Sequence, residues 1–540
     1  MKAHYFGFFF IVLGIFARIW LYLQNGELLM DEAYLAASIY HSSFKDILSG
    51  NLPYGQTAPL GFILSVKLLS QLFGPSEYVL RFIPFVSGIL LLFLAYSFVK
   101  REFNIKTAGI FLFFLSISDP LLFYTVQFKQ YQTEALISLI YLNFYCLKRQ
   151  TIMAGNMPFK LVPMSLILVL FGNTPIFVLC GIFLAILYEQ RKNNNLLLFL
   201  KNNCVKILIV ALSCIAYYYF YLSQINAVKS GFMHSFWDRY YIGNEWSIFE
   251  KIPLYFKHYV IPLIGQYFTV ISPIEGVNAL LFTGCFCGGC YFLFHKKNHI
   301  FIAIITTICI LLFFHITRFY PIGYPLSKNE MDIYVVGIRL FLYFIPISLI
   351  PVSFFLEKSL QQRYVAIFAF CIMAVFAIYS NEWRFDKGIV GYEVGHIVKE
   401  MNKFNNGNSL IFMNKGAEAA YLYRQHGNKE SREYYILEDE SLPMPAGING
   451  DKKEVLTVKN IDSVSEIFNI ALNKQKEYLI FLFVRSDSIA TRQAKEILKL
   501  VQINFPEKWR LTYSPRSGNV ISDNAIAIFV DLRHLYGSDR

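Results

Sequence analysis

The feature that most constrains this chain is a succession of long apolar runs separated by short basic turns. A helix needs about 17 to 22 apolar residues to cross the roughly 30 Å of hydrocarbon in a bilayer. We predict about eleven such spans, of which the fifth and sixth are short. They lie near residues 5–23, 79–99, 107–124, 131–147, 161–172, 174–189, 205–222, 277–294, 299–316, 336–356 and 363–380.

Composition and charge favour the same class. Of the 540 residues, 55% are hydrophobic and 16% charged, which is too apolar for an ordinary soluble enzyme. The net charge of +12 does not indicate a nucleic-acid partner, because much of the basic charge lies in short turns, where it marks the cytoplasmic side of a membrane protein. These turns contain Lys100-Arg101, Lys148-Arg149, Arg191-Lys192 and Lys296-Lys297.

Topology follows from these turns. With a cytoplasmic N-terminus, alternation of the spans places all four basic turns inside and puts the loop after residue 23 and the region after residue 380 outside. We therefore predict a multi-pass protein of the plasma (inner) membrane, with an extracytoplasmic C-terminal domain. Arg18 interrupts the first apolar run, which we interpret as an uncleaved anchor rather than a signal peptide.

The chain divides at about residue 381 into a membrane domain, residues 1–380, and a domain of mixed composition, residues 381–540. Strand-like runs alternate with helical patterns in the second domain, which predicts a small α/β sandwich. The strands are expected at 409–413, 477–484 and 524–530, and the helices near 392–404, 415–425, 462–474 and 487–504.

Candidate functional residues gather in the predicted outer loops. The acidic pair Asp31-Glu32 follows the first span, and residues 31–78 are expected to form two amphipathic juxtamembrane helices on the outer leaflet. Between these helices, the turn at residues 53–59 carries Tyr54 and Gln56, which we place close to Asp31.

A second group of polar residues lies at the mouth of the fourth span. Gln127, Gln130, Tyr131 and Glu134 fall at i, i+3, i+4 and i+7, which predicts one helical face. Polar residues that enter a membrane helix are costly unless they line a functional cavity. Lys129 lies within this group, and Arg339 begins the tenth span on the same side.

The cysteines give no sign of a disulfide framework. All nine precede residue 372 and most lie inside apolar runs. The group Cys285, Cys287 and Cys290 lies within one predicted span, where we expect small packing residues rather than a metal site.

The outer loops resemble those of a known family, the membrane glycosyltransferases of the GT-C superfamily that use polyprenyl-phosphate sugars. The resemblance is to the protein mannosyltransferase and lipid A aminoarabinose transferase branch, which is glycosyltransferase family 39-like. It covers roughly residues 1–380 and rests on the order of five motifs rather than on any single one. These are Met30-Asp31-Glu32-Ala33-Tyr34, Gln56 to Leu60, Glu77 to Pro84, Phe128 to Tyr131 and Gly337 to Pro346.

The resemblance implies that Asp31 is the catalytic base, with Glu32 as its catalytic neighbour. Transfer of a sugar to a hydroxyl needs such a base, and direct displacement inverts the anomeric carbon. Lys129, Arg339 and Arg81 are candidates to bind the donor phosphate. Glu32 or Glu134 could hold a divalent cation, although the sequence identifies no metal. Predicted substrate-binding residues are Tyr54, Gln56, Gln130, Tyr131 and Glu134.

Simpler explanations exist for each residue. An Asp-Glu pair also suits a solvated helix start, Lys129 and Arg339 suit the ends of membrane spans, and Arg81 suits an ion pair with Glu77. Gln130, Tyr131 and Glu134 suit hydrogen bonds between helices.

The expected activity is that of a hexosyl- or pentosyltransferase, with membrane lipids and a lipid-linked sugar donor as partners. The acceptor is a lipid, a glycan or a protein hydroxyl, and the sequence does not distinguish among them. A polytopic transporter, a lipid-linked glycan ligase or polymerase, and a membrane-anchored binding protein are the alternatives.

Overall fold

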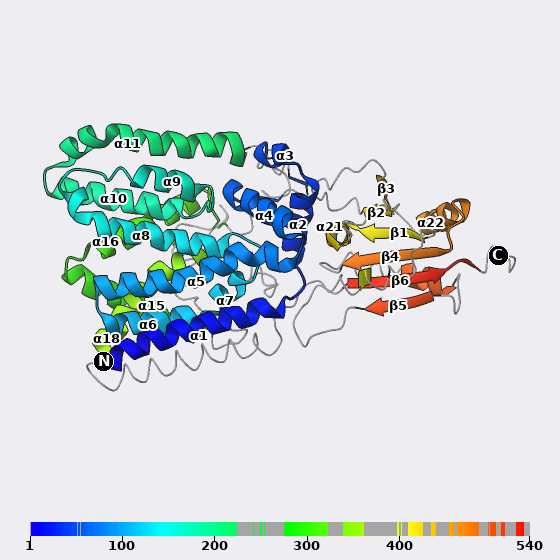
Figure 1. Ribbon diagram of the computed structural model, residues 1–540, viewed down its shortest axis with the longest axis horizontal. Coiled ribbons are helices and arrows are strands. Elements are labelled where there is room, and N and C mark those ends of the chain that lie inside the picture. The colour runs from blue at the N-terminus through cyan, green and yellow to red at the C-terminus, as the bar shows by residue number, and fades with distance from the viewer. Residues whose placement is uncertain are drawn as a thin grey trace.

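The protein consists of a helical bundle and a six-stranded sheet, with three short helices between them (Figure 1). The N-terminus lies at the end of the bundle farthest from the sheet (Figure 1). The structure is a computed structural model that describes residues 2–50, 52–53, 56–223, 241, 249–250, 253, 275–321, 339–360, 397–398, 401, 409–424, 434–438, 453–457, 462–484, 495, 497–503, 509–513 and 525–533.

The described helices of the bundle lie in ten of the eleven segments predicted as spans. In the described ranges, five helices are long and apolar enough to cross a membrane, or six if the bent pair α6–α7 is one span. The predicted polytopic helical membrane protein is therefore confirmed, whereas the number eleven stays a prediction. The bundle helices are α1 (Lys2–Gln24), α5 (Glu77–Glu102), α6 (Ile105–Ile117), α7 (Asp119–Thr125), α8 (Tyr131–Met153), α9 (Leu161–Val169), α10 (Ile176–Lys192), α11 (Leu196–Tyr217) with η2 (Tyr218–Leu222), α15 (Glu275–His295), α16 (His299–Ile316), and η4 (Leu342–Phe344) with α18 (Ile345–Leu360).

Two predicted spans are not represented by a full-length helix in the described residues. The helix α9, in the predicted span 161–172, has nine residues and is about 14 Å long, too short to cross the hydrocarbon. The predicted span 363–380 lies outside the described residues.

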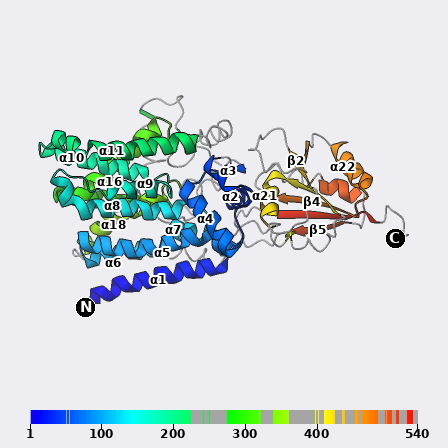
Figure 2. The same cartoon turned by 45° about the horizontal axis from the view of Figure 1, so that its top comes forward.

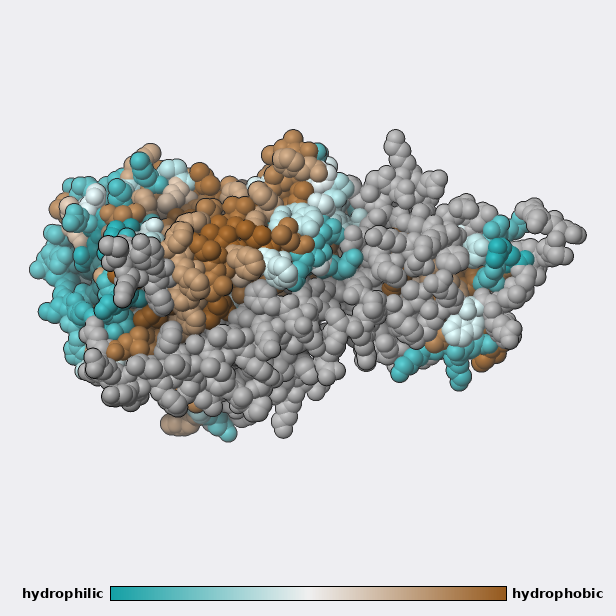
Figure 3. Space-filling model, turned by 60° about the horizontal axis from the view of Figure 1, so that its bottom comes forward, coloured by the Kyte–Doolittle hydropathy of each residue, from teal (hydrophilic) through white to brown (hydrophobic). Residues whose placement is uncertain are grey.

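The outer surface of the bundle is suited to lipid. A band of hydrophobic side chains crosses it next to a hydrophilic end (Figure 3). Phe8, Phe9 and Phe16 of α1 and Leu208 and Leu212 of α11 are exposed. A surface of this kind contacts hydrocarbon in a membrane protein.

One predicted span, 107–124, is broken. The helices α6 and α7 are bent by 58° at Ser118, which has an extended conformation before Pro120. Proline has no amide hydrogen and its ring clashes with the carbonyl four residues earlier, so α6 cannot continue through Pro120, and the break leaves carbonyl groups unpaired. Arg18, fully buried in α1, donates to the carbonyl of Leu115 at 3.3 Å and to that of Gly14 at 3.0 Å. The cation in the first span therefore provides a hydrogen-bond donor for one carbonyl group beside this break, that of Leu115.

The described part of the juxtamembrane segment contains three helices, where the sequence predicted two. They are α2 (Met30–His41), α3 (Phe44–Leu48) and α4 (Leu60–Phe73), and they lie at the end of the bundle that faces the sheet (Figure 2). Ser43 caps α3 by accepting from the amide of Asp46 at 3.2 Å. The buried Lys67 of α4 donates to the carbonyls of Ile39 and Ser42, at 2.7 and 2.9 Å, and so caps the end of α2.

The sheet has the strand order β3-β2-β1-β4-β6-β5. The strands β1 to β4 pair in parallel and β6 is antiparallel to both neighbours. Three predicted strands correspond to β1, β4 and β6. The sequence did not predict β2, β3 and β5, since each is a five-residue run that includes polar residues. The elements are β1 (Ser409–Asn414), α21 (Lys415–Arg424), β2 (Tyr434–Glu438), β3 (Lys453–Thr457), α22 (Asp462–Asn473), β4 (Tyr478–Val484), β5 (Trp509–Tyr513) and β6 (Ala525–Asp531).

Both faces of the sheet are covered, because alternate residues of a strand point to opposite sides. Phe412 and Phe481 pack in a core with Ile467 of α22. On the other face, Ile411 belongs to a core that includes residues of α21 and continues into α2 and α4. The rings of Tyr40 and Tyr423 lie 5.6 Å apart at this junction. The helix that begins at Met30 is therefore packed against the sheet domain.

The contact of α15 with α18 gives a test of the bundle. A Cβ on Gly289 would lie 2.8 Å from the Cα of Pro351, whereas a Cβ on Gly284 of the same helix meets no atom within 4 Å. We expect Gly289→Ala to lower the free energy of unfolding by about 1–3 kcal/mol through overpacking. The control Gly284→Ala should leave it unchanged or raise it by up to about 1 kcal/mol. Thermal unfolding in detergent measures both, and equal midpoints would contradict this packing.

Candidate active site

The acidic loop and the distant Arg339 meet in the fold. The Oδ2 atom of Asp31 lies 2.6 Å from a guanidinium nitrogen of Arg339, 308 residues away in sequence. The Tyr320 hydroxyl donates to the carbonyl of Leu340 at 3.0 Å and so holds the chain beside Arg339. The Asp31 side chain is 45% exposed, against 15% for Arg339. This carboxylate is thus charge-paired and still accessible to a reactant.

Glu32, the next residue, is in the opposite environment. It is buried, and its Oε2 accepts from the backbone amide of Leu29 at 2.9 Å at the start of α2. Its two oxygens also accept from Arg81, each at 3.2 Å, and Oε1 accepts from the backbone amide of Phe128. The predicted acidic pair therefore divides into one accessible carboxylate and one that is fully engaged in holding the loop.

Arg81 is as completely engaged as its partner. Besides the ion pair with Glu32, it donates to the carbonyl of Gly26 at 2.5 Å and to that of Glu27 at 3.2 Å. Every guanidinium nitrogen thus has an acceptor. This arrangement favours a positioning role for Arg81 over the predicted contact with the donor phosphate.

Lys129 lies in the turn between α7 and α8, outside the helices that cross the membrane. Its buried ammonium donates to the side-chain oxygen of Gln56 at 3.0 Å. Burial lowers the pKa of Lys129; the charges of Asp31 and Glu32 oppose this shift and that of Arg339 adds to it. The two predicted phosphate-binding cations, Lys129 and Arg339, therefore share one electrostatic neighbourhood with Asp31.

The predicted polar stripe is not one helical face. The helix α8 begins at Tyr131, so Gln127 and Gln130 precede it. The amide of Phe128 is bound by Glu32 and so cannot donate to the carbonyl of Tyr124, which prevents α7 from continuing through Phe128 into α8. Gln127 and Gln130 are buried all the same.

Tyr131 and Glu134 occupy different surroundings within α8. The ring of Tyr131 packs edge to face against that of Tyr124, with centroids 5.2 Å apart. Glu134 is buried and accepts from the amide of Asn173 at 2.9 Å, and from the Thr174 hydroxyl at 2.8 Å. Glu134 therefore organises the loop before α10.

Two tyrosines that we did not predict hold the segment that contains Gln56. The Tyr221 hydroxyl donates to the carbonyl of Ala58 at 3.1 Å. The Tyr217 hydroxyl accepts from the amide of Leu60 at 3.3 Å and donates to Asn173 at 3.1 Å. A signal was present, since these tyrosines are four residues apart in the aromatic run 217–221. The predicted substrate residue Tyr54 lies outside the described residues.

The charges suit an anionic ligand. Arg339 is paired with Asp31 and Arg81 is paired with Glu32, so a carboxylate matches each of these two cations. The hydrogen-bond partner of the buried Lys129 is a neutral amide. A buried cation of this kind is stabilised by an anion. The predicted divalent cation stays a prediction. Both oxygens of Glu32 accept from N–H groups, which disfavours Glu32 as a ligand of such a cation.

Comparison with known proteins identifies the fold. No family model matches the sequence, and no curated protein is significantly similar to it. The apo crystal structure of ArnT from Cupriavidus metallidurans covers 100% of both chains, with a TM-score of 0.55 and 12% identity. ArnT from the same organism bound to undecaprenyl phosphate covers 96% of this chain and 97% of its own, with a TM-score of 0.52 and 10% identity. The GT-C-like fold that the sequence resemblance implied is confirmed.

The ion pair between Glu32 and Arg81 can be tested by a double-mutant cycle. Either single change, Glu32→Gln or Arg81→Gln, leaves a buried charge without its partner and should lower the free energy of unfolding by about 3–5 kcal/mol. The double variant should recover part of this loss. Thermal unfolding in detergent measures these changes in stability. The more exposed pair of Arg533 and Asp531 is the control, and its interaction energy should be about 0–1 kcal/mol. Strict additivity would show that the two residues do not interact.

Proposed function

We propose that this protein is an integral membrane glycosyltransferase that moves a sugar from a polyprenyl-phosphate donor to a hydroxyl acceptor on the extracytoplasmic face. The observation that carries the proposal is the accessible Asp31 carboxylate paired with Arg339 in the neighbourhood of Lys129. The fold adds support, since ArnT, a lipid A aminoarabinose transferase, shares it and has been crystallised with undecaprenyl phosphate.

In the proposed reaction, Asp31 accepts the proton of the acceptor hydroxyl as its oxygen attacks the anomeric carbon. The bond between that carbon and the phosphate oxygen breaks on the opposite face, so the configuration inverts and polyprenyl phosphate leaves. Negative charge develops on the leaving phosphate, where the fixed cations Arg339 and Lys129 stabilise it. When the phosphate shares Arg339, the carboxylate of Asp31 loses part of its ion pair and becomes a stronger base.

The other predicted residues have supporting roles in this scheme. Glu32 and Arg81 act on the reaction through the position of Asp31 and of the turn at residues 126–130. Gln56 orients Lys129. Gln130 and Tyr131 follow Lys129 in the chain and stay predicted contacts of the substrate. The identity of the sugar, hexose or pentose, and of the acceptor, lipid, glycan or protein, is not specified by these contacts.

One observation keeps a transporter as a second candidate. Discontinuous helices are typical of secondary transporters, and the pair α6–α7 is bent by 58°. The bend is accounted for by Pro120 and Arg18, however, and the site lies at the end of the bundle. A lipid-linked glycan ligase or polymerase would use the same base and cations, and differs from our proposal in its donor.

The proposal predicts the effect of Asp31→Asn. This variant keeps the shape of the side chain and removes its basicity, so transfer of a radiolabelled sugar from extracted polyprenyl-phosphate donors should fall by about 10²-fold or more while donor binding is retained. A matched control is Asp46→Asn, which changes a carboxylate of the exposed cap of α3 and should leave transfer unchanged. Equal activity of Asp31→Asn and the wild type would remove Asp31 from the chemistry.

The lowered pKa of Lys129 predicts a pH dependence of donor binding. The ammonium is charged below its pKa and neutral above it, so affinity for the donor phosphate should fall as the pH rises through that lowered value. Lys129→Arg stays charged over the whole range and should keep its affinity at alkaline pH. Binding of undecaprenyl phosphate to the detergent-solubilised protein measures this, and identical profiles of the two proteins would show that Lys129 does not bind the phosphate.

A further inference from the structure

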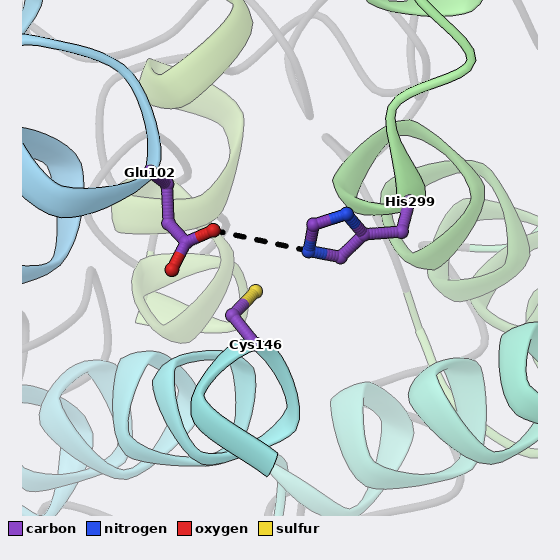
Figure 4. Close-up of side chains that lie close together, drawn as sticks. All are labelled: Glu102, Cys146 and His299. Atoms are coloured by element: carbon purple, nitrogen blue, oxygen red, sulfur yellow. Dashed lines mark ion pairs between the residues drawn. The ribbon is translucent and has the colours of Figure 1, made fainter. Parts of the chain in front are cut away.

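Three side chains with metal-binding chemistry converge at the end of the bundle that is far from Asp31. They are Glu102, the last residue of α5, Cys146 of α8 and His299, the first residue of α16 (Figure 4). One ligand atom of each residue lies within 4.8 Å of those of the other two. Their order in the chain gives no hint of this arrangement.

Each of the three groups directs a donor atom to a common point. One oxygen of Glu102, Oε1, accepts from Arg101 at 2.8 Å, which leaves Oε2 directed to His299 at 3.9 Å. The Nε2 atom of His299 is buried and has no hydrogen-bond partner among the described residues. A buried ring nitrogen without a partner is costly, and a metal ion would satisfy it.

The two neighbouring arginines each have an acceptor outside the three proposed ligands, and the contact of Arg101 with Glu102 uses Oε1, not the oxygen that faces His299. Arg149 pairs with Glu189 at 2.8 Å, and Arg101 donates to Asn143 at 3.0 Å as well as to Glu102. The ring of Tyr145 packs edge to face on His299, with centroids 5.7 Å apart, and restricts the plane of the imidazole.

We propose that Glu102, Cys146 and His299 bind a Zn²⁺ ion, with water as the fourth ligand. A thiolate, an imidazole and a carboxylate are the ligand types that Zn²⁺ takes, at about 2.0–2.3 Å, which corresponds to ligand atoms about 3.5 Å apart in a tetrahedron. The observed separations require the side chains to close by about 1 Å. Cys146 binds as the thiolate, and its proton passes to solvent when the metal binds.

The position of this site suggests a structural role. Along α5, Glu102 is 21 residues from Arg81, a distance of about 31 Å, and the predicted topology places it on the cytoplasmic side. The ion would join α5, α8 and α16 at one end of the bundle. At the opposite end, α5 carries Arg81, and the turn before α8 carries Lys129. The site is thus distinct from the proposed sugar-transfer site and does not depend on it.

The test uses the full chain in detergent, stripped of metal with a chelator and titrated with Co²⁺ alone. We expect a thiolate-to-cobalt charge-transfer band in the near ultraviolet that saturates at one ion per chain and disappears when Zn²⁺ is added. Cys146→Ser should abolish the band, and Glu102→Gln and His299→Ala should weaken binding by at least about tenfold. The exposed cysteines provide matched controls, since Cys204→Ser and Cys309→Ser should leave the band unchanged.

A second measurement needs no variant. Zn²⁺ should protect Cys146 of the wild-type protein from alkylation, as mass spectrometry of the peptides reports, and leave the alkylation of Cys204 and Cys309 unchanged. Two results would overturn the proposal. One is a Co²⁺ band that persists in Cys146→Ser; the other is alkylation of Cys146 at the same rate with and without Zn²⁺.

Discussion

The buried ion pair of Glu32 and Arg81 is the interaction on which the arrangement of the site depends. Burying two charges is unfavourable unless each is fully hydrogen-bonded. Here both Glu32 oxygens accept from backbone amides as well as from Arg81, and Arg81 also donates to two carbonyls. The network joins the loop after α1, the start of α2, the first turns of α5 and the turn at residues 126–130. It therefore fixes where α8 begins and how Lys129 approaches Gln56.

The same network explains why two adjacent carboxylates have different functions. Successive residues of a helix point about 100° apart, so burial of Glu32 directs Asp31 to another side, where it meets Arg339. The other end of α2 is held by Lys67 and by packing against α21 of the sheet domain. The sheet domain is therefore part of the support of the proposed catalytic helix. Its removal would uncover apolar residues of α2, such as Leu35 and Ile39, which share a core with α21.

Local patterns in the sequence predicted the elements well and their partners poorly. Apolar runs located the main membrane helices, and strands β1, β4 and β6 were found because their residues are apolar on both faces. The pairing of Arg81 with Glu32, 49 residues away, has no local signal, and neither has the capture of the Phe128 amide that ends the predicted polar stripe. Asp31 and Arg339 were predicted from the topology of the spans to lie on the same outer face, but their contact was not predicted. The convergence of Glu102, Cys146 and His299 was not predicted, because each lies on a different helix.

The central claim is that Arg339 and Lys129 hold the phosphate of a polyprenyl donor next to Asp31. The most direct measurement is an experimental structure of the full chain in a lipid nanodisc with undecaprenyl phosphate bound. Our account predicts phosphate density in contact with Arg339 and Lys129, with Arg81 still paired with Glu32. Phosphate bound elsewhere, or in contact with Arg81 after its pair with Glu32 has broken, would contradict it.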